Sequence, residues 1–387
     1  MPGSFSFRLN RTDGAARLGA FETQHGMVHT PTFMPVGTSG AVKALTAHDL
    51  EECGAEIMLG NTYHLYLRPG EKLIRKMGGL AEFTGWKKST LTDSGGFQVF
   101  SMQDLLTIDD EGVTFRSHHD GSRHRFFPEK VIEIERDLGA DIIMSFDQCA
   151  PYPADRELAS AAARRTFDWA RKGLEHFRKL EAVEATGAAL FGIVQGSVYP
   201  DLRRLSAEQI ISLDFSGYAI GGLAVGESKE EMEDTLGHTI ELLPQDKPRY
   251  MMGVGYPEDL LMAASYGVDM FDCVLPTRNA RTGMVFTSEG PLVFRNADCA
   301  RDDRPLDPNC GCKVCRRYSR AYIRHLYNQR EITALVLATY HSTYFFQKLL
   351  LGIRESIKDG CFGEFRREFL DLYLQGNYIT DRYPDGR

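Results

Sequence analysis

Short apolar segments recur along the chain, and most of them are continuous rather than alternating with polar residues. Continuous runs are typical of strands covered on both faces, as in a parallel sheet. Eight segments have this character: Thr32–Val36, Glu56–Leu59, Ser89–Leu91, Asp141–Phe146, Ala189–Val194, Tyr218–Ile220, Arg249–Val254 and Met270–Cys273. Helical patterning fills intervening stretches such as Glu129–Leu138, Arg156–Leu180 and Pro257–Tyr266. The chain therefore alternates strands with helices.

Eight such units, each strand ending in glycine or a polar residue, predict a (β/α)8 barrel, the TIM barrel of the α/β class. A doubly wound open sheet is the alternative, but no Gly-x-Gly-x-x-Gly opens a helix after an early strand. Alternation at Phe5, Phe7 and Leu9 predicts an antiparallel sheet that caps one barrel end. The regular pattern breaks down after the eighth strand, where we expect an insertion. The expected segments are 1–30 (N-terminal sheet), 31–294 (strands 1–8), 295–340 (insertion) and 341–387 (last barrel helix and C-terminal helices).

Composition narrows the class of protein. The 387 residues are 43% hydrophobic, which is ample for a large core, and the net charge of −8 argues against a non-specific nucleic-acid coat. It still allows a local basic patch that docks one RNA. Eight cysteines are too few for a secreted disulfide scaffold. No hydrophobic signal core or segment of membrane-spanning length is present, so we expect a cytoplasmic protein with no membrane partner.

Three cysteines, Cys310, Cys312 and Cys315, lie within six residues in a spacing typical of a zinc knuckle. We expect tetrahedral Zn²⁺ rather than a disulfide. Spacing alone leaves Cys299, His325 and His341 open as the fourth ligand. A site closed by four protein ligands has no open position for chemistry, so the metal is expected to be structural.

The stretch from Cys310 to Arg330 contains six Lys or Arg residues and no acidic residue. Helical spacing would place Arg316, Arg320 and Arg324 on one face, and Tyr318, Tyr322 and His325 on another. A solvated helix with a packed aromatic stripe is one interpretation. An RNA-facing basic edge with an aromatic interface is the other.

Three aspartates, Asp93, Asp147 and Asp272, each follow a short apolar run. A buried carboxylate is costly unless it is partnered or used, so we expect all three at the rim of one site. Neighbouring residues suit recognition of a guanine-like base: a carboxylate and a carboxamide for its polar edge, exposed backbone amides, and two side chains that could cover its ring. They are Asp147, Gln195, Gly222, Leu223, Phe97 and Met252.

Two carboxylates that flank a glycosidic bond are the core of double-displacement chemistry. Downstream of Asp272, Arg278 and Arg281 suit phosphate contacts, although structural salt bridges would explain them equally well. Likewise, Ser94-Gly95-Gly96 could be a simple turn.

Several long motifs resemble the bacterial tRNA-guanine transglycosylases, also called queuine tRNA-ribosyltransferases. They are Asp-Ser-Gly-Gly-Phe-Gln-Val-Phe-Ser from Asp93, Phe-Gly-Ile-Val-Gln-Gly-Ser-Val around Gln195, Gly-Tyr-Ala-Ile-Gly-Gly-Leu-Ala-Val-Gly-Glu around Gly222, and Met-Phe-Asp-Cys-Val-Leu-Pro-Thr-Arg around Asp272. The Cys-x-Cys-x-x-Cys cluster with a downstream histidine belongs to the same pattern, and the resemblance covers nearly the whole chain. It implies a (β/α)8 barrel with a zinc-binding insertion.

The resemblance implies exchange of guanine at wobble position 34 of tRNA for a 7-deazaguanine, during queuosine formation. Asp272 would be the nucleophile on ribose C1′, and Asp93 the general acid/base. The partner would be a tRNA with a GUN anticodon, and the protein a homodimer with Tyr318, Tyr322 and His325 near its contact. The resemblance also assigns the other site residues. The edge of the base would be bound by Asp147, Gln195, Gly222 and Leu223, and its ring would be covered by Phe97 and Met252. Zinc would be bound by Cys310, Cys312, Cys315 and His341, and the anticodon loop would be held by Arg278 and Arg281.

One position departs from the pattern. Bacterial members usually carry Asp-Glu-Cys-Thr where this chain has Asp147-Gln148-Cys149-Ala150. Cys149 and Val225 resemble the type that prefers the aminomethyl base preQ1, so we expect preQ1 rather than queuine. The rival functions are a non-catalytic tRNA-binding subunit, against which Asp93 and Asp272 argue, and an ordinary barrel glycosidase, which would leave the zinc insertion without a purpose.

Overall fold

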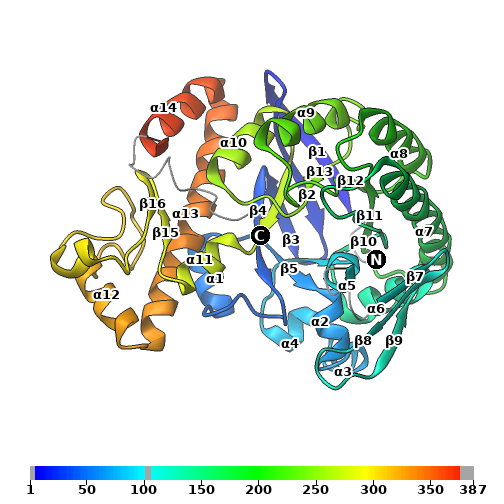
Figure 1. Cartoon of the computed structure of the whole chain (residues 1–387), viewed down its shortest axis with the longest axis horizontal. Coiled ribbons are helices and arrows are strands. Elements are labelled where there is room, and N and C mark those ends of the chain that lie inside the picture. The colour runs from blue at the N-terminus through cyan, green and yellow to red at the C-terminus, as the bar shows by residue number, and fades with distance from the viewer. Residues whose placement is uncertain (1–4, 101–105, 375–387) are drawn as a thin grey trace.

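The computed structural model describes residues 5–100 and 106–374, and its centre is a closed barrel of eight parallel strands (Figure 1). The strands are β4 (Thr32–Gly37), β5 (Ile57–Asn61), β6 (Ser89–Asp93), β10 (Ile142–Met144), β11 (Ala189–Val194), β12 (Gly217–Ile220), β13 (Arg249–Met251) and β14 (Met270–Cys273). Around the barrel they follow chain order, with β14 closing onto β4. The predicted (β/α)8 fold is confirmed, and each of the eight predicted runs overlaps a strand.

Helices form the outer layer, and their first residues explain where they begin. Proline occupies the first turn of three of them, where its fixed φ suits the helix and its missing N–H is not needed. Two others have side-chain caps, Asp155 in one and Ser228 with Glu231 in the other. The five helices are α6 (Pro128–Leu138), α7 (Arg156–Val183), α8 (Pro200–Ser212), α9 (Lys229–Ile240) and α10 (Pro257–Ser265).

The first βα units carry short helices: α1 (Ala47–Cys53) after β4, then α2 (Thr62–Leu67), α3 (Glu71–Lys76) and α4 (Gly79–Thr84) after β5, and α5 (Gly96–Phe100) after β6. An antiparallel sheet that we did not predict follows α5. Its strands are β7 (Leu106–Asp109), β8 (Gly112–Arg116) and β9 (Arg123–Phe126). This sheet stands between β6 and α6, beside the strand ends that carry the site.

The N-terminal antiparallel sheet consists of β1 (Ser6–Asp13), β2 (Ala16–Thr23) and β3 (Gly26–Thr30), as predicted. It lies against the beginnings of the barrel strands. The ring of Phe5 packs on Phe191 of β11, and Thr23 shares a 2.8 Å hydrogen bond with Ser89, the first residue of β6. This end of the barrel is therefore closed, and the opposite end is free to hold a site.

After β14 the chain forms α11 (Leu275–Arg281), a hairpin of β15 (Val285–Thr287) and β16 (Gly290–Leu292), α12 (Arg320–Asn328), α13 (Ile332–Asp359) and α14 (Phe362–Leu374). Helix α13 returns to the barrel, where Gln347 donates to the carbonyl of Phe33 in β4. The helix spans residue 340, where we expected the insertion to end and the last barrel helix to begin. The outer parts of the expected end segments, residues 1–4 and 375–387, lie outside the described residues. No helix in the described ranges combines the length and apolar character needed to cross a membrane.

Candidate active site and metal centre

The carboxyl ends of the barrel strands bring the expected site residues to one face, which is where (β/α)8 barrels hold their sites. Asp93 is the last residue of β6, and Asp272 lies in β14. Asp147 follows β10 by three residues, Gln195 directly follows β11, and Gly222 lies two residues beyond β12. Strands β6, β10, β11 and β12 are consecutive neighbours in the barrel. The side chains of Asp93, Asp147 and Gln195 therefore come from adjoining strands. Asp272 comes from β14, which is separated from β6 by β4 and β5.

Asp93 is buried and is held by four donors. Oδ1 accepts from the backbone N–H of Thr62 at 3.0 Å and of Gly95 at 3.2 Å, and Oδ2 accepts from Asn61 Nδ2 and from Gln98 Nε2. Burial raises the pKa of Asp93 to about 6, the nearby charge of Asp272 adds to the rise, and hydrogen bonds from Asn61, Thr62 and Gln98 oppose it. The two carboxyl groups are thus close enough to interact, and Asp93 can hold or release a proton near neutral pH.

Asp147 lies at the centre of a buried polar group. Its Oδ1 accepts from Ser94 Oγ at 3.2 Å, and its Oδ2 accepts from Gln195 Nε2 at 2.7 Å. Burial raises the pKa of Asp147 to about 6, although both hydrogen bonds favour the charged form. The arrangement aligns a carboxylate and a carboxamide edge to edge.

Glycines allow this close packing. A Cβ on Gly96 would lie 2.7 Å from the backbone oxygen of Asp147. At Gly222, where φ is +68°, a Cβ would lie 2.5 Å from Gln195 Oε1. Since real Cβ atoms do not approach so closely, both positions require glycine. The Ser-Gly-Gly turn is therefore part of the site and not an isolated turn.

Asp272 retains one unengaged oxygen. Its Oδ1 accepts from Tyr250 Oη at 2.6 Å and from the backbone N–H of Gly253 at 2.8 Å. Across the described ranges, no donor reaches Oδ2. Burial raises the pKa of Asp272 above its usual value, and the two donors counteract this. The side chain is only partly covered, so Oδ2 is free to react with a ligand.

Sequence reasoning missed several residues that support the site. Arg203 of α8 is fully buried and donates to four backbone carbonyls, including Gly221 at 2.8 Å and Gly222 at 3.3 Å. Glu227 accepts from the backbone N–H of Val225 and Gly226, which closes the loop after Gly222. Asn61 and Tyr250 are partners of the aspartates described above. Only Asn61 gave a signal, as the polar residue that ends β5.

The two arginines predicted after Asp272 lie on α11. Arg278 is exposed, and Arg281 is half-buried with its Nη1 covered and unpaired within the described chain. Burial and the neighbouring charge of Arg278 lower the pKa of Arg281. Neither arginine has a salt bridge to a described carboxylate, so the structural alternative raised for them is not what the structure has.

The remaining predicted residues, Leu223, Met252 and Phe97, follow strands β12, β13 and β6. Leu223 is buried directly after Gly222, and the half-buried Met252 is held by a backbone hydrogen bond from its N–H to the carbonyl of Ile220. Phe97 is 56% exposed, which is unusual for a phenylalanine and leaves its ring available for stacking.

The cysteine cluster forms a set of converging ligand atoms. The three Sγ atoms and one nitrogen of His341 all lie within 4.8 Å of one another, and His341 Nδ1 is 3.3 Å from Cys315 Sγ. Tetrahedral zinc with bonds of about 2.0–2.3 Å holds its ligands about 3.3–3.8 Å apart. The other nitrogen, Nε2, is 2.9 Å from the carbonyl of Phe286, which orients the ring toward the thiols. The donor set therefore fits a metal ion.

His341 is the residue that completes the cluster; spacing had left Cys299 and His325 equally open. It comes from α13, and it is fully buried, as Cys312 nearly is. Four protein ligands fill a tetrahedral shell and leave no open position, so the metal would be structural. The three cysteines belong to the segment between β16 and α12, which lies to one side of the barrel (Figure 1).

The basic stretch after the cluster differs from the helical faces we predicted, because α12 begins only at Arg320. Arg316 and Tyr318 precede the helix. Arg320 is buried, pairs with Asp302 at 3.0 Å and donates to the carbonyls of Pro305 and Leu306, so it is a structural residue. The predicted basic edge on one helical face is therefore wrong.

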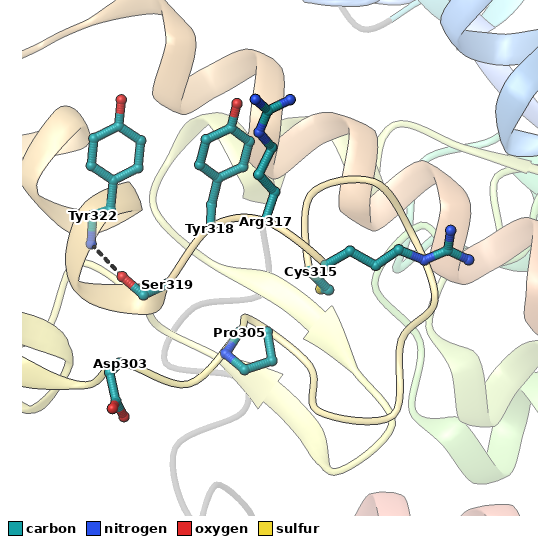
Figure 2. Close-up of a pocket in the computed structure, with 8 residues that line it drawn as sticks. Asp303, Pro305, Cys315, Arg317, Tyr318, Ser319 and Tyr322 are labelled. Carbon is teal, nitrogen blue, oxygen red and sulfur yellow. Dashed lines mark hydrogen bonds between the residues drawn. The ribbon is translucent and has the colours of Figure 1, made fainter.

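Tyr318 and Tyr322 form the aromatic part of this segment. Their rings stack with centroids 5.5 Å apart, and Figure 2 shows both pointing in the same direction, beside Arg317. They line a cavity of about 340 Å³ together with Asp303 and Pro305. Tyr322 is 44% exposed. Tyr318 is half-buried. A stacked aromatic pair that is partly exposed suits a protein contact.

Comparisons with known proteins agree with these features. The family model described as queuine tRNA-ribosyltransferase matches residues 12–375. A queuine tRNA-ribosyltransferase of Caldanaerobacter subterraneus is 56% identical over 358 residues, covering 92% of this chain and 94% of the relative. Proteins of the same name from Halothermothrix orenii and Nitratidesulfovibrio vulgaris are 55% and 52% identical, and each alignment covers 96% of this chain and 98% of the relative.

Proposed function

The chain belongs to the queuine tRNA-ribosyltransferase family, and from that premise we propose that it exchanges guanine at wobble position 34 of tRNA for a 7-deazaguanine. The observation that carries the proposal is the buried pair of Asp147 and Gln195, packed against Gly222, beside two interacting carboxyl groups, Asp93 and Asp272. The first group suits a purine edge. The second suits transfer at a glycosidic carbon.

We infer a double displacement. Asp272 Oδ2 attacks ribose C1′, the C1′–N9 bond breaks, and guanine leaves with its electron pair and a proton from Asp93. The incoming base then returns a proton to Asp93, its N9 attacks C1′, and the bond from C1′ to Asp272 breaks. Tyr250 and Gly253 hold Oδ1, which orients Oδ2 for attack. A pKa of about 6 lets Asp93 serve in both directions near neutral pH.

Recognition of the base follows from the same geometry. The Asp147 carboxylate would accept from N1–H and the amino group of guanine, Gln195 and the backbone at Gly222 and Leu223 would bind the remaining polar atoms, and Phe97 and Met252 would cover the ring. Arg278 and Arg281 would contact phosphates of the anticodon loop, since Arg281 has a covered N–H without a partner. The tRNA would carry a GUN anticodon.

We propose preQ1, rather than queuine, as the incoming base. The departure at Gln148 lies on a contact with α7: its side-chain oxygen accepts from Arg165, and its backbone N–H donates to Thr166. Where bacterial members usually have Glu, the uncharged side chain of Gln148 therefore accepts a hydrogen bond from Arg165 of α7. Incubating the protein and tRNA with equal preQ1 and queuine tests the choice, and preferential incorporation of queuine would contradict it.

Zinc is the metal we propose for the cluster of Cys310, Cys312, Cys315 and His341, because three thiolates and an imidazole in a closed shell suit it. Bound there, it would cross-link the insertion to α13. We also propose a cytoplasmic location, where thiols that bind a metal stay reduced.

A homodimer is the assembly we propose, with Tyr318, Tyr322 and His325 at its contact. The stacked pair of exposed Tyr322 and half-buried Tyr318 and the adjoining cavity support this surface. Molar mass measured by light scattering for the native chain and for Tyr322→Ala tests the assignment, and a native monomer would contradict it.

Labelled guanine and tRNA provide the direct test of the activity. A transglycosylase exchanges the label into intact tRNA. A non-catalytic tRNA-binding subunit binds the tRNA without exchange, and a glycosidase leaves the tRNA unlabelled.

The pH dependence of the exchange should follow the buried carboxyl groups. Burial raises the pKa of Asp147 to about 6 and that of Asp272 above its usual value, and both must be ionised, one to accept the base and one to attack. We expect kcat/KM for guanine to fall about tenfold per pH unit or more below pH 6. Rates of label incorporation from pH 5 to 8 measure this, and an unchanged rate at pH 5 would contradict it.

Unfolding would not account for such a loss. A carboxyl whose folded-state pKa is raised to about 6 binds more protons in the folded state than in the unfolded state between pH 3.8 and 6. Its contribution to stability is therefore present below the unfolded pKa and disappears as the pH rises through the folded pKa. Circular dichroism at pH 5 serves as the control.

Replacing Gly96 by Ala should weaken base binding selectively. The new Cβ would lie 2.7 Å from Asp147 O and 3.1 Å from Asp147 Oδ1, so Asp147 must move. We expect kcat/KM for guanine to fall about 10- to 100-fold, mainly through KM for the base. Gly363→Ala is the matched control, since a Cβ there meets no atom within 4 Å. Equal kinetics for the two variants would contradict the role of Gly96.

A further inference from the structure

A cluster of basic and titratable side chains stands beside Asp93, apart from the residues assigned above. The rings of His64 and His118 lie edge to face with centroids 5.7 Å apart, and those of His118 and His119 are 3.9 Å apart. Burial and the neighbouring imidazoles lower the pKa of His64 and of His119, and Lys43 adds to the effect on His64 as Arg68 does on His119. All but His64 are exposed. We call these five residues the histidine cluster.

The histidine cluster adjoins the proposed site. His64 belongs to α2, whose first residue, Thr62, donates its N–H to Asp93. The backbone of α2 also packs against the glycine turn after Asp93, because a Cβ on Gly95 would lie 3.1 Å from the nitrogen of Tyr63. His118 is tied to the same helix by a 2.9 Å hydrogen bond between its Nδ1 and Tyr63 Oη. The histidine cluster therefore lies next to the helix and the glycine turn that hold Asp93.

Positive charge here is not neutralised within the described chain. No salt bridge joins the five residues to a described carboxylate, although the net charge of the whole sequence is −8. Asp120 is the acidic group next to His119, and its Oδ1 is engaged by Ser122 Oγ at 2.6 Å. The charged and titratable groups that face the three imidazoles are Lys43, Tyr63, Arg68 and Asp120, together with the imidazoles themselves.

These imidazoles are not arranged as a metal site. Among the described residues, the group whose ligand atoms converge is the one formed by the three cysteines and His341. Two cations, Lys43 and Arg68, and the two imidazoles of His118 and His119 are instead exposed, with His64 half-buried beside them. Such a surface suits an extended anion.

The order of the strands shows how far this surface extends. Strands β14, β4, β5 and β6 are consecutive neighbours in the barrel. Arg278 and Arg281 follow β14, Lys43 follows β4, His64 and Arg68 follow β5, and His118 and His119 follow β6 and α5. Figure 1 shows α11, α2 and β8 following one another along the same half of the barrel rim. The base-reading residues follow β10, β11 and β12, on the other half.

We propose that the histidine cluster binds phosphates of the RNA strand that enters the site, continuing the contact begun by Arg278 and Arg281. The inference rests on the proposed function. Phosphates placed among the imidazoles favour their protonated form, so RNA binding takes up protons and strengthens as the pH falls toward the histidine range. The cluster thus makes part of the affinity for tRNA depend on pH.

The test compares the affinity for tRNA of four chains at pH 6 and pH 8: the native chain, His118→Gln/His119→Gln, Arg68→Gln and His238→Gln. The double variant should bind about tenfold more weakly at pH 6, with a salt slope shallower by about one or two, and should approach the native affinity at pH 8. Arg68→Gln should weaken binding at both pH values. His238→Gln, exposed on α9 at the far side of the barrel, should match the native chain.

The inference would be overturned if the double variant and Arg68→Gln bind tRNA at pH 6 with the same affinity and the same salt slope as the native chain. Label exchange by the native chain, measured in the same preparations, separates this result from failure of the proposed function. If the native chain exchanges guanine while the variants bind tRNA normally, only the RNA surface is refuted. If the variants lose affinity but the native chain exchanges nothing, the surface stands and the proposed reaction fails.

Discussion

Replacing Asp272 by Asn should abolish covalent trapping of tRNA and lower guanine exchange by about 10⁴-fold or more, as loss of a nucleophile does. Asn keeps an oxygen in the position of Oδ1, where Tyr250 Oη and the N–H of Gly253 donate. The fold and the base pocket should therefore remain intact while the attacking oxygen is lost. The measurement is the tRNA–protein adduct retained after denaturation, together with label exchange.

Tyr250→Phe is the control for this variant. It removes one of the two donors to Asp272 Oδ1 but leaves the carboxylate in place. We expect it to form the adduct more slowly, by about 10- to 100-fold, and still to reach it. If the Asp272→Asn variant forms the adduct as the native chain does, the assignment of Asp272 as nucleophile is refuted.

Replacing Cys312 by Ala should remove the bound metal and destabilise the protein severely. Cys312 is 1% exposed, and its sulfur lies 3.7 Å from His341 Nδ1 and accepts the backbone N–H of Cys315 at 3.3 Å. Structural zinc contributes about 10–16 kcal/mol of binding free energy in small zinc domains, and that energy supports folding. We expect about one zinc per native chain by elemental analysis, none in the variant, and a loss of soluble protein or a large fall in Tm.

Cys299→Ala provides the matched control. Cys299 is buried in the same hydrophobic cluster as Cys312 and Cys315 but lies outside the converging ligand set. It should keep the metal and lose only the small stability of a buried thiol, about 1 kcal/mol. A stable, metal-free and active Cys312→Ala protein would contradict the structural role, and loss of metal in Cys299→Ala would contradict the ligand set.

The barrel and the carboxylates at its rim could be predicted because both depend on local patterns. Continuous apolar runs mark buried parallel strands, and a glycine or polar residue after each run marks its carboxyl end, which is how Asp93, Asp147 and Gln195 were found. The β7–β9 sheet could not be predicted in this way: its strands are short, and the four residues of β9, Arg123–Phe126, include one apolar side chain. The same segment bears part of the histidine cluster.

The partners of the site residues could not be predicted, because they depend on which distant residues the fold brings together. In the sequence, Arg203 resembles an ordinary charged residue of an amphipathic helix. In the structure, it is buried and donates to the carbonyls at the ends of two strands. Tyr250 lies in a strand like any other aromatic residue. His341 is 26 residues beyond Cys315, in helix α13, so spacing could not distinguish it from His325 or Cys299. The resemblance to a family supplied that assignment.

Helix α13 connects the metal-binding cluster to the barrel, although the sequence suggested that these are separate segments. It carries His341, the proposed metal ligand, near its middle, and farther along Gln347 donates to the carbonyl of Phe33 in β4 and Arg354 donates to that of Pro31. Deleting the insertion, or grafting it onto another barrel, would either cut this helix or remove one of its anchors. The metal-bearing segment is therefore not an interchangeable module, and we expect it to have been inherited together with the barrel as one cooperative folding unit.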